Sequence, residues 1–243
     1  MANGRLATIG LYDNDAVQEA MTLVQRVNDD GIETIRVLFP DQHGILRGKT
    51  ISARRLVSLF TSGLGVPSTL LLKDTAHKTV FDVWGSDNTI DGLPLNGAGD
   101  LLLVPDLGTF IPLPWSPHSA MLICDVVQRS GDSVSFSSRT ALKNAVMALQ
   151  DAGYSATFGL EVEFQIFTRL DDALSHDQAT MPPAAVKTAN LTQGWQYLTE
   201  TRYGEAEEIL DELRRTADAM GLAPCSMEVE MGPSQFELSL IHI

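Results

Sequence analysis

The chain has 243 residues, a formal net charge of −14 and a hydrophobic content of 44%. So acidic a chain is not attracted to nucleic acid or to anionic membrane surfaces, and we expect neither as a partner. Two distant cysteines, Cys124 and Cys225, do not make a disulfide framework, and we expect no signal peptide and no membrane span. A globular protein of the reducing cytoplasm is predicted.

The N-terminal part predicts a helix, a β-hairpin and a second helix. Either Asp13 or Asp15 can cap the first helix, and Ser52 can cap the second. A Pro-Asp-Gln-His-Gly turn separates two segments rich in β-branched residues, as in a hairpin. The predicted elements are a helix ending near residue 28, strands at 32–39 and 45–51, and a helix at 53–61.

The middle of the chain is rich in loop-forming residues. Glycine, proline, aspartate and asparagine are concentrated between residues 63 and 100, which predicts loops. Strands are predicted at 101–104 and 120–127, and the Ser-Gly-Asp that follows predicts a linker. We therefore expect one domain over residues 1–130 and another over 131–243.

The second half predicts an α+β arrangement of helices, strands and one long polar loop. Ser137 or Ser138 can cap a helix over 139–151, and a further helix is predicted over 205–220. Residues 168–200 between them predict an irregular loop. The side chains predicted to face the core are Leu142, Val146 and Leu149 in the first helix and Ile209, Leu213 and Ala217 in the second.

Two short acidic segments are the most informative part of the sequence. Residues 159–167 alternate between apolar and polar side chains, so Glu161 and Glu163 share one face of a strand, with Cα atoms about 6.6 Å apart. In residues 228–238, a Gly-Pro-Ser-Gln turn separates Glu230 from Glu237, and a hairpin would bring both to one site.

These glutamates have two interpretations. Two ordinary strands with solvated polar faces would explain each segment alone. However, strands are depleted in glutamate, and like charges on one face repel each other unless cations lie between them. Carboxylate oxygens suit Mg²⁺ or Mn²⁺, often together with substrate phosphate. The pattern therefore favours a divalent-metal site for phosphate chemistry.

Both segments resemble motifs of the glutamine synthetase family. Glu-Val-Glu-Phe at 161–164 is similar to the family's first metal strand, and Glu-Met-Gly-Pro-Ser-Gln-Phe-Glu at 230–237 is similar to its second motif. The segments Leu-Phe-Pro-Asp-Gln-His-Gly at 38–44 and Arg-Gly-Lys at 47–49 resemble its N-terminal β-grasp domain. The resemblance implies an α+β fold in which a β-grasp domain precedes the first part of the catalytic domain.

The resemblance implies ATP-dependent ligation of the glutamate γ-carboxylate to ammonia through γ-glutamyl phosphate. Glu163, Glu230 and Glu237 would then hold one Mg²⁺ or Mn²⁺ ion, and Glu161 a second ion beside the ATP phosphates. Asp41 would help to bind ammonium at a neighbouring subunit's active site, in a dodecamer-type ring of identical chains. Glutamate, ATP and ammonia or an amine are the implied substrates.

The sequence departs from the family pattern in three places. Ser234 replaces the usual turn glycine, Cys225 stands where many members place a glutamate near ATP, and the apolar tail 238–243 differs from the family. The metal-binding histidine and the phosphate-binding arginines of the family are not in this sequence, and His242 is not assigned as a substitute. We therefore expect a truncated chain without ligase activity of its own.

Two alternatives stay open. One is the same chemistry on another amine, as in γ-glutamylpolyamine synthetases. The other, from a different class, is a non-catalytic metal-binding or regulatory relative that keeps the fold.

Overall fold

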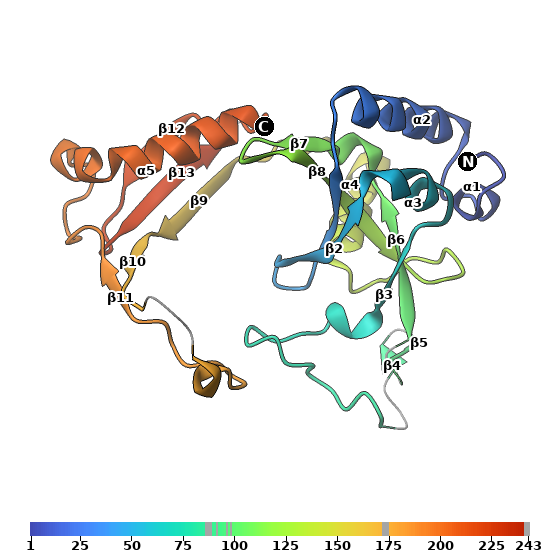
Figure 1. The fold of residues 1–243 in the computed structure, drawn as a ribbon, viewed down its shortest axis with the longest axis horizontal. Helices are drawn as coiled ribbons and strands as arrows, with labels where there is room; N and C mark the ends of the chain where they lie inside the picture. The colour runs from blue at the N-terminus through green and yellow to red at the C-terminus, as the bar shows by residue number, and fades with distance from the viewer. Residues whose placement is uncertain (86–88, 91, 96, 98, 172–174, 241–243) are drawn as a thin grey trace. The chain divides into compact units, whose positions relative to one another are not determined.

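The structure is a computed structural model that describes residues 1–243 except 86–88, 91, 96, 98, 172–174 and 241–243 (Figure 1). Its contacts divide the chain into two compact units, Met1–Ser155 and Ala156–Ile243. The tail residues 241–243 and some of the predicted loop residues, namely 86–88, 91, 96, 98 and 172–174, lie outside the described part.

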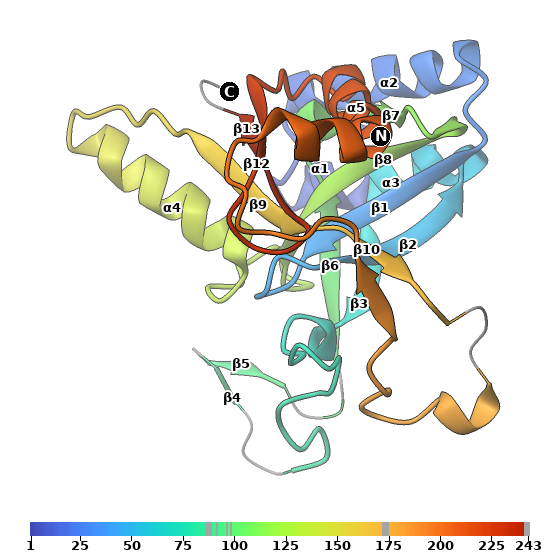
Figure 2. The same cartoon turned by 90° about the vertical axis from the view of Figure 1, so that its left-hand side faces the viewer.

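The first unit is built on a mixed sheet in the order β2-β1-β8-β6-β3, with β7 paired to β8. β1 pairs antiparallel with β2 and parallel with β8, so β1 lies between them (Figure 2). The strands of this sheet are β1 (Thr34–Pro40), β2 (Leu46–Ser52), β3 (Leu64–Pro67), β6 (Asp100–Pro105), β7 (Ile111–Leu113) and β8 (Ser116–Val127). The short strands β4 (Thr89–Ile90) and β5 (Leu93–Pro94) pair with each other.

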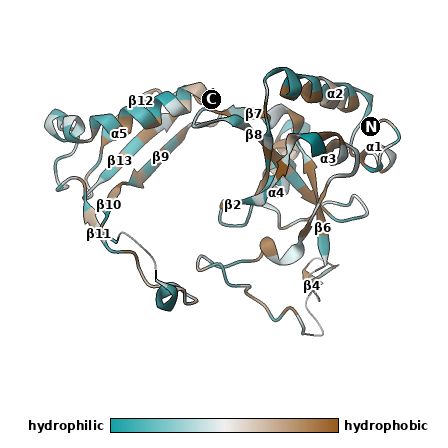
Figure 3. Cartoon of the chain, viewed as in Figure 1, coloured by the Kyte–Doolittle hydropathy of each residue, from teal (hydrophilic) through white to brown (hydrophobic). Residues whose placement is uncertain are grey.

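Alternating burial explains how this sheet makes a core. Ile35, Val37 and Phe39 of β1 are fully buried, whereas the residues between them are partly exposed. Their side chains cluster with Leu103 of β6 and Leu122 of β8, and Figure 3 shows β6 as a largely hydrophobic strand. The predicted hairpin is confirmed within one or two residues and the two later strands are confirmed in place, but β3 lies where the sequence predicts a loop.

Helices cover part of this sheet and contribute to the same core. The helices of the first unit are α1 (Arg5–Thr8), α2 (Asn14–Asp29), α3 (Leu56–Ser62) and α4 (Ser138–Asp151), with 3₁₀ turns η1 (Ala53–Arg55), η2 (Ser68–Leu70) and η4 (Leu107–Thr109). The hairpin followed by a parallel strand is compatible with a β-grasp domain, which stays a prediction. The predicted domain boundary at residues 130/131 also stays a prediction.

The cap of α2 gives a first testable prediction. The Asp13 carboxylate accepts a hydrogen bond from the Ala16 N–H at 2.8 Å, whereas Asp15 lies within the first turn. Replacing Asp13 by alanine should therefore lower the unfolding free energy by about 1 kcal/mol. Asp15→Ala should cost less, because it removes only a favourable charge at the helix N-terminus. Urea unfolding of both variants checks this order; a larger loss for Asp15→Ala would contradict it.

The helix α4 corrects one prediction. None of its residues is buried, and Leu142, which the sequence predicts to face the core, has 58% of its surface exposed. Ion pairs join α4 to the sheet instead: Arg139 lies 3.1 Å from Asp125 and also contacts Asp106, and Lys143 lies 2.6 Å from Asp125. The helix itself is confirmed, but Leu142, Val146 and Leu149 do not pack into the core of the described structure.

The second unit has a three-stranded antiparallel sheet in the order β12-β13-β9 and one long helix (Figure 1). These elements are β9 (Leu160–Gln165), α5 (Glu200–Ala219), β12 (Ser226–Val229) and β13 (Gln235–Leu240). Two short strands, β10 (Phe167–Arg169) and β11 (Thr188–Asn190), form a separate pair, and η5 (His176–Gln178) lies between them in sequence. None of the described helices is both long enough and apolar enough to cross a membrane.

One face of the three-stranded sheet packs against α5. Phe236 and Val229 are buried with Ala206 and Leu210 of the helix, and the rings of Phe236 and Phe164 lie 6.3 Å apart. The prediction of Ile209 and Leu213 as core residues is wrong, since both are about 40% exposed. The buried residues Ala206, Leu210 and Ala217 repeat at intervals of four and seven residues. The buried stripe of α5 is therefore displaced around the helix axis from the predicted one.

Candidate metal centre

The other face of the three-stranded sheet carries all four predicted metal ligands. Glu237 of the central strand lies directly opposite Glu163 of β9 on one side and Glu228 of β12 on the other. Glu161 lies two residues from Glu163, and Glu230 follows the end of β12 with its N–H bound to the Gln235 carbonyl at 3.0 Å. We call this surface the acidic face; it consists of Glu161, Glu163, Glu228, Glu230 and Glu237.

Strand alternation explains why these residues share one face. In β13 the buried Phe236 points toward α5, so Gln235, Glu237 and Ser239 point the other way. The same rule in β9 directs Phe164 to the core and Glu161 and Glu163 to the acidic face. The two segments, well separated in the chain, meet because β13 pairs with β9 from Gln235 to Leu240.

The carboxylates on the acidic face affect each other. Partial burial raises the pKa of Glu237, and the charges of Glu161, Glu228, Glu230 and Glu163 raise it further. The pKa of Tyr197 is also raised, mainly by the charge of Glu230, so this phenol lies near the carboxylates of the acidic face. Like charges directly opposite in a sheet are destabilising, and a bound cation would remove that repulsion.

Glutamine side chains hold the turn and the first strand in place. Gln235 donates a hydrogen bond to the Glu163 carboxylate, and its amide oxygen accepts from the Gly232 N–H at 2.8 Å. Gln165 donates to the Pro233 carbonyl at 3.1 Å. A Cβ on Gly232 would stand 2.4 Å from the Gln235 amide oxygen, so a larger residue there would displace the end of the Gln235 side chain. These contacts hold the turn between Glu230 and Glu237 in shape.

The donor chemistry of the acidic face fits Mg²⁺ or Mn²⁺, since it consists of carboxylate oxygens without sulfur or imidazole. In the described part of the chain, however, no three Asp, Glu, His or Cys side chains converge on a point where they could hold one ion. The structure thus brings the four predicted ligands to one surface without closing them around a centre. Their role as ligands stays a prediction.

Ser234 occupies the turn position where the family motif has glycine, and the backbone there is left-handed, with φ of 59°. Its hydroxyl accepts hydrogen bonds from the N–H groups of Leu191 at 2.6 Å and Thr192 at 3.3 Å. The Ser234 N–H in turn donates to the Thr192 hydroxyl at 3.0 Å. A serine is kept in this conformation by contacts with the segment that follows β11.

Two substitutions of Ser234 should distinguish the contribution of its hydrogen bonds from the cost of its left-handed backbone. Ser234→Ala leaves two N–H groups without their acceptor and keeps the left-handed strain, so we expect a loss of about 1 to 3 kcal/mol in unfolding free energy. Ser234→Gly loses the same bonds but relieves about 1 kcal/mol of strain. Urea unfolding of both variants should rank the glycine variant as the more stable of the two. The reverse order would show that the backbone is unstrained.

Asp41 lies apart from the acidic face in sequence and within the first unit. Its carboxylate is fully buried and accepts hydrogen bonds from the N–H groups of His43 and Ile45, while the Arg47 Nε lies 2.7 Å away. Burial alone would raise the pKa of Asp41, but these donors hold it below its ordinary value. In the described structure, the Asp41 carboxylate accepts its hydrogen bonds from N–H groups of its own turn. Its ammonium-binding role stays a prediction.

Sequence reasoning missed Glu228 as a member of the acidic face. Glu228 and Glu230 are separated by Val229, which is buried against α5, so a period of two directs both glutamates to the opposite side. Extending the alternation by two residues back from Glu230 would have found it. Glu228 also accepts a hydrogen bond from the Ser226 hydroxyl at 2.8 Å. Cys225, to which we assign no nucleotide contact, is exposed just before β12.

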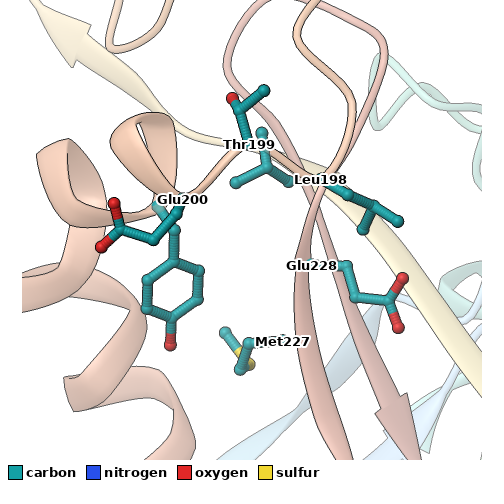
Figure 4. Close-up of a pocket in the computed structure, with 7 residues that line it drawn as sticks. Leu198, Thr199, Glu200, Met227 and Glu228 are labelled. Carbon is teal, nitrogen blue, oxygen red and sulfur yellow. The ribbon is translucent and has the colours of Figure 1, made fainter.

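Two hollows adjoin this sheet. One, of about 220 Å³, lies between β12 and the start of α5 and is lined mostly by apolar groups, with Glu200 and Glu228 at its edge (Figure 4). The other, of about 320 Å³, is lined by Glu163, Phe164, Gln165 and Gln235 and opens beside the acidic face. Of the two, the second combines a predicted metal ligand with polar amides, so it is the better candidate for binding chemistry.

Comparison with known proteins assigns the C-terminal part of the chain to a protein family. Residues 135–243 match the family described as glutamine synthetase, catalytic domain. Residues 135–243 thus belong to the glutamine synthetase catalytic-domain family. Both acidic segments lie inside the matched range.

The relatives that this chain matches differ in the products that their names give. It is 30% identical to a gamma-glutamylanilide synthase of Acinetobacter sp, over 93% of this chain and 47% of that protein. It is 28% identical to a glutamine synthetase of Halobacterium salinarum, over 98% of this chain and 46% of that protein. The chain thus spans about half the length of the curated relatives it matches.

Solved structures share this fold over part of their length. A GmaS structure in complex with ADP covers 89% of this chain with a TM-score of 0.65 and 22% sequence identity, and the match spans 43% of that protein. The mixed α and β fold is therefore that of glutamine synthetase-type proteins.

Proposed function

We propose that the chain is part of an ATP-dependent ligase that joins the γ-carboxylate of glutamate to ammonia or another amine. The observation that carries this proposal is the acidic face, which gathers both family motifs on one surface of the sheet. We further propose that the protein acts in the cytoplasm as a homo-oligomer.

In the proposed reaction, a γ-carboxylate oxygen of glutamate attacks the γ-phosphorus of ATP, and ADP leaves. The nitrogen lone pair of the amine then attacks the acyl carbon of γ-glutamyl phosphate, phosphate leaves, and the nitrogen loses a proton. Glu163, Glu230 and Glu237 would hold one Mg²⁺ or Mn²⁺ ion and Glu161 a second. When bound, such ions neutralise charge between the ATP phosphates and the glutamate carboxylate.

The residues of this chain orient these ligands before any ion binds. Gln235 fixes the Glu163 carboxylate by a hydrogen bond, and the short turn from Gly232 to Gln235 sets the separation of Glu230 and Glu237. A positioned ligand loses less freedom on binding, so such contacts raise affinity for the ion.

A phosphate-release assay tests the proposal. The longest protein that the gene encodes is incubated with ATP, glutamate and Mg²⁺ or Mn²⁺, and with ammonium, putrescine, aniline or no amine. We expect release that depends on glutamate and on one of the amines. Aniline is included because a 30% identical relative is named a gamma-glutamylanilide synthase. Absence of release with every amine would favour the non-catalytic alternative.

The same assay on the 243-residue chain alone gives a further expected result. We predict no turnover, because the histidine and the arginines that complete the family's site are not in this sequence. Measurable turnover by that chain would show that the acidic face and its surroundings suffice for the reaction.

A further inference from the structure

The polar side of the three-stranded sheet holds a buried hydroxyl that has no partner. Ser239 of β13 is 3% exposed, and its Oγ makes no hydrogen bond in the described structure. In the part of the chain that is described, the Ser68 hydroxyl is the other side-chain group in this situation, and it belongs to the first unit. A buried hydroxyl without a partner is unfavourable, so its retention needs a physical reason.

The register of the sheet places this hydroxyl beside one particular carboxylate. Ser239 lies directly opposite Glu161 of β9, and on its other side it lies opposite Ser226 of β12. Directly opposite residues have Cβ atoms about 4.5 to 5.5 Å apart, a gap that a glutamate side chain can span to reach a serine hydroxyl. Glu161 itself is exposed, so its carboxylate is not fixed by packing.

Two glutamates in the neighbouring register of the sheet show how an adjacent side chain can hold a carboxylate by a hydrogen bond. There, Glu163 lies opposite Glu237 and is held by the Gln235 amide, and Glu228 is held by the Ser226 hydroxyl. Glu161 differs from Glu163 and Glu228 in that no hydrogen bond to its carboxylate is found among the described residues. The unpaired donor and the unsupported acceptor are therefore direct neighbours in the sheet.

We propose that the Ser239 hydroxyl is a positioning group, which donates a hydrogen bond to the Glu161 carboxylate when a divalent cation binds and so orients that carboxylate toward the ion. This inference rests on the proposed metal-binding role of the acidic face. Ser239 acts through Glu161 and does not touch the ion. Partners of this kind fix the direction of a ligand and raise its affinity for the metal.

The test combines metal affinity with stability of the metal-free 243-residue chain. Ser239→Ala removes the unpaired hydroxyl, so the melting temperature without metal should rise by about 2 to 4 °C. The same variant should bind Mn²⁺, followed by its electron paramagnetic resonance signal, about 10 to 100-fold more weakly. A purely structural role for Ser239 would not move stability and affinity in opposite directions.

Ser68→Ala is the matched control, because it removes the other buried hydroxyl without a partner among the described residues, and Ser68 belongs to the first unit rather than to the acidic face. Ser68→Ala should also raise the melting temperature, but it should leave the Mn²⁺ affinity within about threefold of the unchanged protein, far less than the loss for a group that orients a ligand. Equal Mn²⁺ affinity of Ser239→Ala and the unchanged chain would overturn the inference and leave the proposed metal site intact. No Mn²⁺ binding by the unchanged chain would overturn both.

Discussion

Replacing Glu237 by glutamine is expected to abolish tight Mn²⁺ binding and to raise the melting temperature of the metal-free chain. Glu237 lies in the central strand, between Glu163 and Glu228, and is the carboxylate that the others affect most clearly. Glutamine keeps the size of the side chain but removes its charge. We expect the Mn²⁺ affinity to fall by more than the roughly 100-fold typical of losing an outer contact.

The rise in metal-free stability follows from the sign of the pKa shift. Because the pKa of Glu237 is raised, the folded chain holds that proton more readily than the unfolded chain does. At neutral pH the ionised carboxylate therefore opposes folding, and a neutral glutamine removes this opposition. Melting curves with and without MnCl₂ measure both effects on the same samples.

A matched control is Glu207→Gln on α5, which changes the net charge equally at an exposed position outside the acidic face. It should leave both the Mn²⁺ affinity and the metal-free melting temperature nearly unchanged. If Glu237→Gln kept its Mn²⁺ affinity, the acidic face would be an ordinary solvated surface. That outcome would support the first interpretation of the two strands.

Much of the acidic face could be predicted because the causes within each segment are local, although the pairing of β9 with β13 joins distant parts of the chain. A period of two fixes which side chains share a face, and a short turn fixes how two strands return on each other. Together with the family resemblance, these rules predict that Glu161, Glu163, Glu230 and Glu237 lie on one face of the sheet. Glu228 follows from the same period and was overlooked.

What sequence reasoning could not supply was the packing between elements. The apolar residues of α4 repeat at helical spacing, yet ion pairs from Arg139 and Lys143 determine its contacts with the sheet. In α5 the apolar residues allow more than one buried face. Ala206 and Leu210 are buried because they pack against Phe236 and Val229 of the sheet. The short strand β3 was missed because its glycine and proline are typical of loops, although it pairs with β6.

Asp41→Asn is expected to lower the unfolding free energy of the first unit by about 3 to 5 kcal/mol, the usual cost of removing one partner of a buried ion pair. Asparagine can still accept the N–H groups of His43 and Ile45, but its amide would face the Arg47 guanidinium with a second donor. Only 14% of the Arg47 side chain is exposed, so water cannot easily replace the lost carboxylate.

The pH dependence of the unchanged chain has a defined sign. Since the pKa of Asp41 is lowered in the folded state, its contribution to stability is present above the ordinary carboxyl value of 3.8 and is lost as the pH falls through the folded value. Asp41→Asn should lack this component. Urea unfolding of both proteins between about pH 7 and about pH 3 measures the difference.

A double-mutant cycle with Arg47→Met separates a structural role from the predicted ammonium-binding role. If the ion pair dominates, Asp41→Asn combined with Arg47→Met should cost clearly less than the sum of the single changes, since neither charge is then left unpaired. If Asp41 instead serves the amine, Asp41→Asn should leave the unfolding free energy within about 0.5 kcal/mol of the unchanged protein and raise the KM for the amine. The buried and fully paired carboxylate favours the first result.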